Sequence, residues 1–352
     1  MVRKVYQLMD ALDYGDAVSN HAINLNTNLL DMGYETKIFS IYVHDKVKDL
    51  YNSYKHLYVS KNDVVLFHFS GKTKLLEFVK SLPCKKILVY HNVTPPEFFA
   101  DNPNLFNHCN EGLDQLNEIK DIFDLFIADS DYNLSDLKKM GVKKIEILPI
   151  FIDFDKIKSL DRNKNLLAKY EDSTIFLFVG RVAPNKKHED IIQIFSYYYS
   201  HIDSNSKLIF VGNYEDYMDY YQKLNSMISL LPSRDNIVFT GKVDNRDLTT
   251  YYSLGDIFIC MSEHEGFCVP LLESMAFEIP TIAYNAGAVG TTMGLAGILI
   301  NEKEHEKIAE LINIILENEE IRKKIVEKQK IWIEKFDMTK LRTKVKNILD
   351  SL

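Results

Sequence analysis

The sequence predicts an α/β protein built from two doubly wound parallel sheets. Short apolar runs alternate with longer amphipathic stretches in both halves of the chain, which is the pattern of successive strand–helix units. A charged stretch with few aromatic residues, positions 151–172, separates the two series. The length of 352 residues allows two domains with separate cores. We therefore expect a domain boundary within this stretch.

The first half is expected to form one parallel sheet of about six strands. Ser19 or Asn20 would cap its first helix and Gly33 would end it, while Ser130 would cap a later helix that ends near Gly141. The expected strands are residues 4–8, 36–42, 64–69, 86–91, 124–129 and 143–149, and the expected helices include 19–32 and 72–80.

The second half repeats the alternation and ends in a helical tail. Three amphipathic helices are expected in residues 304–352, with breaks near Asn318 and Phe336. The expected strands are residues 174–179, 207–212, 236–241, 257–261 and 281–284, with helices up to residue 201 and at 216–230, 247–254 and 271–277.

Composition excludes several classes of function. A net charge of −8 argues against bulk binding of nucleic acid. The four cysteines show no CxxC pairing, so buried thiols in a reducing compartment are expected. The chain starts directly in a strand without a signal-peptide pattern, and none of its apolar runs is long enough to span a bilayer. We expect a cytoplasmic protein.

The loop between the strands 257–261 and 281–284 is the strongest candidate site. Pro270 marks the start of a short helix, Glu265 lies in the loop, and Glu273 falls in the expected first turn. Backbone amides at the helix end suit a phosphate, and the two carboxylates suit hydroxyl groups. The alternative is that Glu273 complements the helix dipole and Glu265 is a solvated acid.

Cations follow the strand 174–179. Arg181 and Lys186 flank a turn shaped by Pro184, at a strand end directed toward the same loop, where both could bind phosphate oxygens. Lys187 would replace Lys186 if the register shifted by one residue. Ordinary surface charges are the alternative.

Two further candidate site residues of the first half lie at or after the carboxyl end of a strand. Gly15 lies in the first strand-to-helix turn, where a glycine lets the backbone approach a ligand closely, although the GxGxxG pattern of dinucleotide-binding folds is missing. His91 follows a buried strand and precedes the prolines Pro95 and Pro96, at an edge where α/β sheets place functional groups. Either residue could equally be structural.

The segment E-G-F-C-V-P-L-L-E, residues 265–273, resembles the E-x7-E element of retaining, nucleotide-sugar-dependent glycosyltransferases of family 4. G-R-x-x-P-x-K at 180–186 and Y-H-N-x-T-P-P at 90–96 are similar to further elements of this family. The resemblance covers nearly the whole chain and is strongest from 180 to 300. It implies the GT-B fold, in which two Rossmann-like domains face each other and the last helix crosses back. The implied domains are 1–155 with helix 338–352 on the acceptor side, and 156–337 for the nucleotide sugar.

The resemblance also implies the reaction and its residues. A hexose would pass, with retention of configuration and without a metal or other cofactor, from a GDP- or UDP-linked donor to a glycan or lipid-linked glycan of polysaccharide biosynthesis. The implied catalytic residues are His91, Arg181, Lys186 and Glu265. The implied residues for donor and nucleotide are Gly15, Asp16, Lys242, Val243, Gly266, Phe267, Cys268, Val269 and Glu273.

Several readings remain open at this point. Two D-x-D triplets, at 129–131 and 153–155, resemble metal-binding acids of another glycosyltransferase fold, but the first opens a helix and the second lies in the linker. The family usually has an acid near Gly290 and Thr291, and this chain lacks it, so we assign Thr291 no role. The rival functions are a sugar-nucleotide epimerase, a phosphorylase and a non-catalytic binding protein.

A small basic cluster surrounds Gly141. Its four lysines either complement a helix end or contact an anionic membrane that carries a lipid-linked acceptor. The cluster consists of Lys138, Lys139, Lys143 and Lys144.

Overall fold

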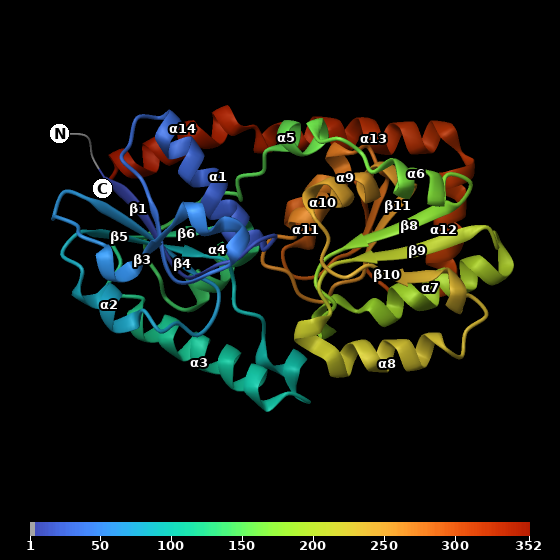
Figure 1. Cartoon of the computed structure of the whole chain (residues 1–352), viewed down its shortest axis with the longest axis horizontal. Helices are drawn as coiled ribbons and strands as arrows, with labels where there is room; N and C mark the ends of the chain where they lie inside the picture. Colours follow the sequence, from blue (N-terminus) through green and yellow to red (C-terminus); the bar gives the residue numbers. More distant parts are fainter. Residues whose placement is uncertain (1–3) are drawn as a thin grey trace. The chain divides into compact units, whose positions relative to one another are not determined.

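The computed structural model describes residues 4–352 and divides into two compact units (Figure 1). Unit 1 is the described part of Met1–Asp153 together with Phe336–Leu352, and unit 2 is Phe154–Lys335. The chain thus passes between units after Asp153 and after Lys335, where the sequence analysis placed the limits at 155 and 337. The predicted class, α/β with two parallel Rossmann-like sheets, is confirmed.

Unit 1 contains a seven-stranded parallel sheet in the order β3-β2-β1-β4-β5-β6-β7. The prediction of about six strands missed β3, which has only three half-buried residues and therefore no apolar run. The strands are β1 Val5–Leu12, β2 Ile38–Val43, β3 Tyr51–Ser53, β4 Val64–Phe69, β5 Lys85–Tyr90, β6 Leu125–Ala128 and β7 Ile145–Ile147.

The first helix of unit 1 begins earlier than predicted. Asp16, rather than Ser19 or Asn20, is its N-cap, because the Asp16 carboxylate accepts a hydrogen bond from the Ser19 amide at 3.0 Å. The caps predicted at Gly33 and Ser130 are confirmed. The helices are α1 Ala17–Asp31, α2 Leu76–Ser81, α3 Pro103–Ile119, α4 Asp131–Lys139 and α14 Met338–Asp350, and α3 was not predicted.

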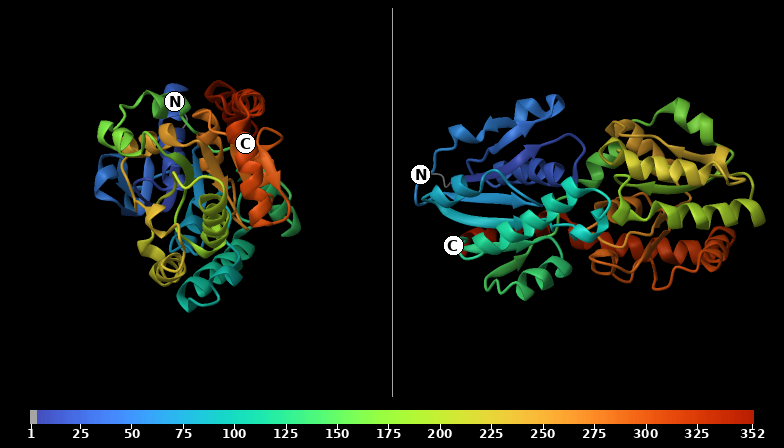
Figure 2. Two further views of the ribbon diagram at one scale, coloured as in Figure 1. Left: turned by 90° about the vertical axis from the view of Figure 1, so that its right-hand side faces the viewer. Right: turned by 90° about the horizontal axis from the view of Figure 1, so that it is seen from below.

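The last helix, α14, completes the core of unit 1. Leu341, Val345 and Ile348 are buried in one cluster with Leu25 and Leu29 of α1 and with strand residues of the sheet. Figure 2 shows this end of the chain beside the strands of unit 1. The spacing of three and four between the apolar residues of α14 is what places them on one face.

Unit 2 has a six-stranded parallel sheet in the order β10-β9-β8-β11-β12-β13. Its central strands are buried apart from Thr174 and Val179 at the two ends of one of them, as their continuous apolar runs predict. The strands are β8 Thr174–Val179, β9 Ser206–Val211, β10 Ile237–Phe239, β11 Ile257–Cys260, β12 Thr281–Tyr284 and β13 Ile298–Ile300.

The helices of unit 2 include two within the stretch predicted as a linker. These are α5 Phe154–Ser159 and α6 Lys164–Tyr170, and Asn163 caps the second. The three-helix tail is confirmed, with Asn318 capping its second helix. The remaining helices are α7 His188–His201, α8 Met218–Ile228, α9 Asn245–Leu254, α10 Val269–Ala276, α11 Val289–Met293, α12 His305–Glu317 and α13 Glu319–Ile333.

Both sheets reverse their strand order beside the first strand of the unit. The reversal lies between β1 and β4 in unit 1 and between β8 and β11 in unit 2. In open α/β sheets, ligands bind outside the carboxyl ends of the strands at such a point. The fold therefore points to the loops after β8 and β11, and after β1 and β4.

Candidate active site

The predicted cations and carboxylates of unit 2 meet at its point of reversal. Lys186 lies in the turn between β8 and α7, and Glu265 lies in the loop between β11 and α10. The Lys186 Nζ atom is 2.6 Å from Glu265 Oε2, and the two side chains are 18% and 9% exposed. The two strands pair directly in the sheet, so the fold itself brings these loops together.

The pair is electrostatically stable. Burial favours loss of the proton from Lys186, but the Glu265 carboxylate outweighs it, and the pKa of the lysine is raised. Lys187 forms a different pair, with Glu263 at 3.2 Å. The structure thus selects Lys186, rather than Lys187, as the lysine that contacts Glu265.

The backbone of the Glu265 loop is held from two sides. Asn185 lies in the turn after β8. Its side-chain amide donates a hydrogen bond to the His264 carbonyl at 3.0 Å, and its backbone carbonyl accepts one from the Glu263 amide at 2.9 Å. On the other side, the Ala288 amide donates to the Glu265 carbonyl at 2.9 Å, and the Thr292 hydroxyl donates to the Phe267 carbonyl at 2.5 Å. The loop is therefore a fixed part of the site.

The segment that departs from the family pattern supplies part of this support. Thr292 is buried and belongs to α11, next to Thr291, to which the sequence analysis assigned no role. Gly287 approaches Glu265 so closely that a Cβ atom at Gly287 would lie 2.8 Å from the backbone N and O atoms of Glu265. These contacts could not be read from the sequence, because they join loops that follow different strands.

We expect Gly287→Ala to lower the activity of this site by about tenfold or more, with a small effect on folding. Gly287 has a φ of +55°, and the added methyl group would collide with backbone atoms, so the Glu265 loop has to shift. Gly33→Ala is the matched control, because Gly33 also has a positive φ, +85°, but its Cβ would meet nothing within 4 Å. Full activity in Gly287→Ala, measured by initial rates, would contradict the role of this contact.

The helix α10 begins directly after Cys268, which has a left-handed φ of +72°. Val269 starts the helix, and Pro270 follows at a position where its missing N–H costs no hydrogen bond. Gly266 and Phe267 complete the turn before it. The predicted amide-rich helix end is thus present. It belongs to the same loop as Glu265, which precedes the Cys268 cap by three positions.

Glu273 lies in the second turn of α10, so its predicted place in the first turn is wrong. One carboxylate oxygen accepts a hydrogen bond from the Tyr252 hydroxyl at 2.7 Å. Burial raises the pKa of Glu273, and the bond from Tyr252 works against this rise. The side chain is half-buried, so it does not serve as an exposed complement to the helix dipole.

The other predicted residues of unit 2 lie at the same edge of the sheet. Arg181 directly follows β8, is exposed, and makes no side-chain hydrogen bond or ion pair with residues 4–352. Lys242 and Val243 follow β10, the edge strand, and precede the Asp244 cap of α9. Arg181 thus lies in the same connection between β8 and α7 as Lys186, and its guanidinium is available to an anion.

In unit 1, Gly15 and Asp16 lie in the turn after β1, at the point of reversal. Gly15 has a φ of +72°, which explains why a glycine occupies this turn. Asp16 caps α1 and also accepts the Ser19 hydroxyl at 3.2 Å. One structural role of Asp16 is therefore established, and its predicted role at the donor remains a prediction.

His91 belongs to a buried polar chain that crosses four neighbouring strands. Its Nδ1 atom lies 2.6 Å from Asp129 Oδ2, and its Nε2 atom lies 2.8 Å from His68 Nδ1. His68 Nε2 in turn lies 2.9 Å from Gln7 Oε1. His21, from α1, places its ring edge against both histidines. Both ring nitrogens of His91 are therefore engaged within the protein.

The hydrogen bonds determine where the protons lie in this chain. Gln7 donates its amide to the Ala22 carbonyl, so its Oε1 accepts from His68 Nε2–H. Neutral His68 then accepts at Nδ1 from His91 Nε2–H. A further proton lies between His91 Nδ1 and Asp129, and burial, opposed by His91, raises the pKa of Asp129.

Most of this buried polar chain was not predicted from the sequence. Its signal was present, because Gln7 and His68 interrupt apolar strands, and a polar side chain that is buried in a strand needs a partner. Asp129 was noticed only as part of a D-x-D triplet. In the structure it is buried against His91, whereas Asp131 is exposed in the first turn of α4.

No helix in the described part of the chain, residues 4–352, is both long and apolar enough to cross a bilayer. The four lysines around Gly141 are all exposed. Two of them, Lys138 and Lys139, lie in the last turn of α4, where they complement the helix dipole.

Comparison with known proteins agrees with the geometry of unit 2. Residues 160–332 match the model of the family described as "Glycosyl transferases group 1". The chain is 22% identical over 249 residues to N-acetyl-α-D-glucosaminyl L-malate synthase of Bacillus anthracis, a match covering 69% of this chain and 61% of that protein. It is 26% identical over 166 residues to a GDP-mannose-dependent α-mannosyltransferase of Mycobacterium tuberculosis, covering 47% and 40%. The chain thus spans about half the length of such relatives.

Solved structures share the whole fold. HepE from Anabaena, solved in complex with UDP, superimposes with a TM-score of 0.76 at 16% identity over 99% of this chain and 100% of that one. WaaG, a glycosyltransferase involved in lipopolysaccharide biosynthesis, gives 0.73 at 14% identity over 98% and 99%. The GT-B fold is confirmed by these matches. The residues that match the model of this family, 160–332, all lie within unit 2, which contains the Lys186–Glu265 pair.

Proposed function

We propose that the chain is a retaining, metal-independent glycosyltransferase that moves a hexose from a nucleotide sugar to a glycan or lipid-linked glycan. The observation that carries this proposal is the Lys186–Glu265 pair at the point of reversal in unit 2, with exposed Arg181 in the same connection between β8 and α7 as Lys186. It unites cations for a diphosphate with a carboxylate for sugar hydroxyls.

Each residue of unit 2 has a role in this mechanism. Arg181 and Lys186 stabilise the negative charge that grows on the departing diphosphate, aided by the amides between Gly266 and Val269. Glu265 binds sugar hydroxyls and fixes the orientation of the ring. Glu273 binds the ribose hydroxyls through the carboxylate that Tyr252 orients, while Lys242 and Val243 line the pocket for the base.

The residues of unit 1 serve the acceptor and the reacting sugar. In the turn after β1, Gly15 faces the donor diphosphate and Asp16 helps to orient the acceptor or the sugar. His91 is held in one orientation by Asp129 and His68. To hydrogen-bond a substrate through Nε2, His91 has to give up its bond to His68. The exposed lysines around Gly141 would contact the anionic membrane that carries a lipid-linked acceptor.

The donor is a UDP- or GDP-linked hexose. HepE binds UDP and UDP-glucose, and the mycobacterial relative is named for GDP-mannose, so both bases are reasonable candidates.

The test is thermal unfolding with UDP, GDP and their common sugar conjugates, each with and without EDTA, followed by product analysis with glycan acceptors. We expect one nucleotide to raise the melting temperature equally in both conditions, and we expect a glycosylated product with retained anomeric configuration. A rise that EDTA abolishes would overturn metal independence. Binding accompanied only by epimerisation of the sugar nucleotide would overturn transfer.

A further inference from the structure

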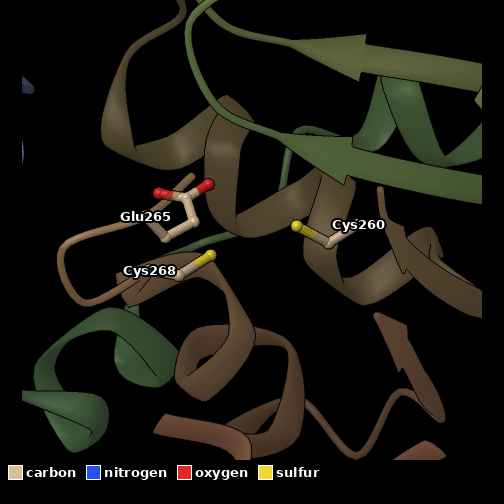
Figure 3. Close-up of side chains that lie close together, drawn as sticks. All are labelled: Cys260, Glu265 and Cys268. Carbon is tan, nitrogen blue, oxygen red and sulfur yellow. The ribbon is translucent and has the colours of Figure 1, made fainter. Parts of the chain in front are cut away.

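Three buried side chains, those of Cys260, Glu265 and Cys268, lie close together (Figure 3). Cys260 ends β11, Glu265 lies in the following loop, and Cys268 caps α10. The two Sγ atoms and a carboxylate oxygen of Glu265 all lie within 4.8 Å of one another. Across residues 4–352, this is the one group of histidine, cysteine and acidic side chains close enough to hold a metal ion.

We propose that Cys260, Cys268 and Glu265 form a binding site for a thiophilic divalent cation such as Zn²⁺ or Cd²⁺. Two thiolates and one carboxylate select soft or borderline ions, whereas Mg²⁺ and Ca²⁺ prefer oxygen ligands alone. The site shares no residue with the D-x-D triplets, and Asp129 of the first triplet is already paired with His91.

The geometry requires only small movements. With metal–sulfur bonds of about 2.3 Å, tetrahedral ligands lie about 3.8 Å apart, so the three atoms close by at most about 1 Å. Rotation of the side chains has to supply this movement, because the backbone of both cysteines is anchored. Cys260 pairs with Ala283 in the sheet, and Cys268 begins a helix.

The charges also balance. Without an ion, the Lys186 ammonium pairs with the Glu265 carboxylate, and the two thiols are the groups that give up protons when an ion binds. Binding replaces two thiol protons with one divalent ion, M²⁺ + 2 R–SH → M(S–R)₂ + 2 H⁺, so the net charge of the site does not change, and the protons pass to the buffer. A carboxylate has two oxygens, so Glu265 can bind the ion while it accepts the hydrogen bond from Lys186, which becomes an outer partner of the centre.

A bound ion would inhibit transfer, a consequence that rests on the proposed function. Glu265 cannot hold an ion and orient sugar hydroxyls with the same oxygen. Ion and nucleotide sugar therefore compete, and the ion is an inhibitor of this site rather than its cofactor.

The test titrates the whole reduced chain with Cd²⁺, in a non-coordinating reductant and without nucleotide, and follows the ultraviolet charge-transfer band of cadmium thiolates. We expect a saturable band at about one ion per chain, with about two protons released. Cys260→Ser and Cys268→Ser should each abolish it. The matched control is the double variant Cys84→Ser, Cys109→Ser, which should keep the full band, because both of these buried thiols belong to unit 1.

A full band in Cys268→Ser, or no band in the wild type, would overturn the site. If the serine variants fail to fold, protection of Cys260 and Cys268 from alkylation by Cd²⁺ in the wild type, read by peptide mass mapping, decides instead. Since binding is read without nucleotide, absence of transfer leaves this result intact. Cd²⁺ that binds without slowing an active enzyme would overturn the inhibition alone.

Discussion

Glu265→Gln is expected to lower the rate of sugar transfer by about 100- to 1,000-fold while leaving nucleoside diphosphate affinity within about threefold of wild type. Glutamine keeps the shape of the side chain but loses the charge that binds sugar hydroxyls. The cations that bind the diphosphate, Arg181 and Lys186, remain. Initial rates and nucleotide titrations on the same preparations measure the two quantities separately.

Glu263→Gln is the matched control for this variant. Glu263 lies in the same loop two positions earlier, but its carboxylate contacts Lys187 and Lys303 instead of Lys186. Its replacement should change transfer by less than about threefold, because these partly exposed ion pairs do not involve Lys186 and contribute little. Equal losses in both variants would show that the loop, rather than the Glu265 carboxylate, matters.

A double variant separates catalysis from stability. Glu265→Gln leaves the ammonium of Lys186 buried without its counter-charge, which destabilises the fold. Adding Lys186→Met removes that charge as well, so the double variant should regain stability in urea unfolding. It should not regain transfer. Recovery of transfer together with stability would mean that the pair serves only the fold.

The sequence was sufficient for the architecture and for the residues of unit 2 that follow each strand. Continuous apolar runs such as 64–69 and 174–179 predicted β4 and β8 with the observed limits, because fully buried parallel strands contain little else. The Lys186–Glu265 contact joins residues 79 positions apart. From the strand ends, we expected Lys186 to face the loop that holds Glu265, but the contact itself was not predicted, since neither the turn nor the loop alone indicates its partner.

Contacts set by tertiary geometry could not be predicted. The short strand β3 has no apolar run, and α5 and α6 lie in a stretch whose charge suggested a linker. The support of the Glu265 loop by Gly287 and Thr292 depends on how the turn after β12 packs, which single-residue propensities do not encode. Polar residues inside apolar runs, such as His68, were the one signal left unused.

Acid should destabilise unit 1 more than unit 2. Burial, together with neighbouring histidines, holds the pKa values of His21 and His68 well below their usual range, and burial beside Lys186 lowers the pKa of His188 to about 3. The folded state therefore leaves these rings neutral, while the unfolded chain protonates them near pH 6.5. Their stabilisation is complete above pH 6.5 and is lost as the pH falls below it, by about 2 kcal/mol per ring between pH 7 and 5.

The total loss of stability in acid differs between the units, because unit 1 holds two buried neutral histidines, His21 and His68, and unit 2 holds His188. The raised pKa of Asp129 works in the opposite sense, since a proton bound only by the folded state favours folding at low pH. We therefore expect a loss of about 2 to 4 kcal/mol in unit 1 and about 2 kcal/mol in unit 2.

Hydrogen exchange of the amides in β4 and β8 at pH 7 and 5, corrected for intrinsic rates, reports the free energy of opening for each unit. His188→Phe should remove the loss in unit 2, because the ring packs between Phe178 and Phe210 and its nitrogens have no hydrogen-bond partner in residues 4–352. His56→Gln, at an exposed position, should change neither unit. Equal protection of β4 at both pH values would mean that His21 and His68 accept protons in the folded state, and the proton order derived for the His91 chain would then be wrong.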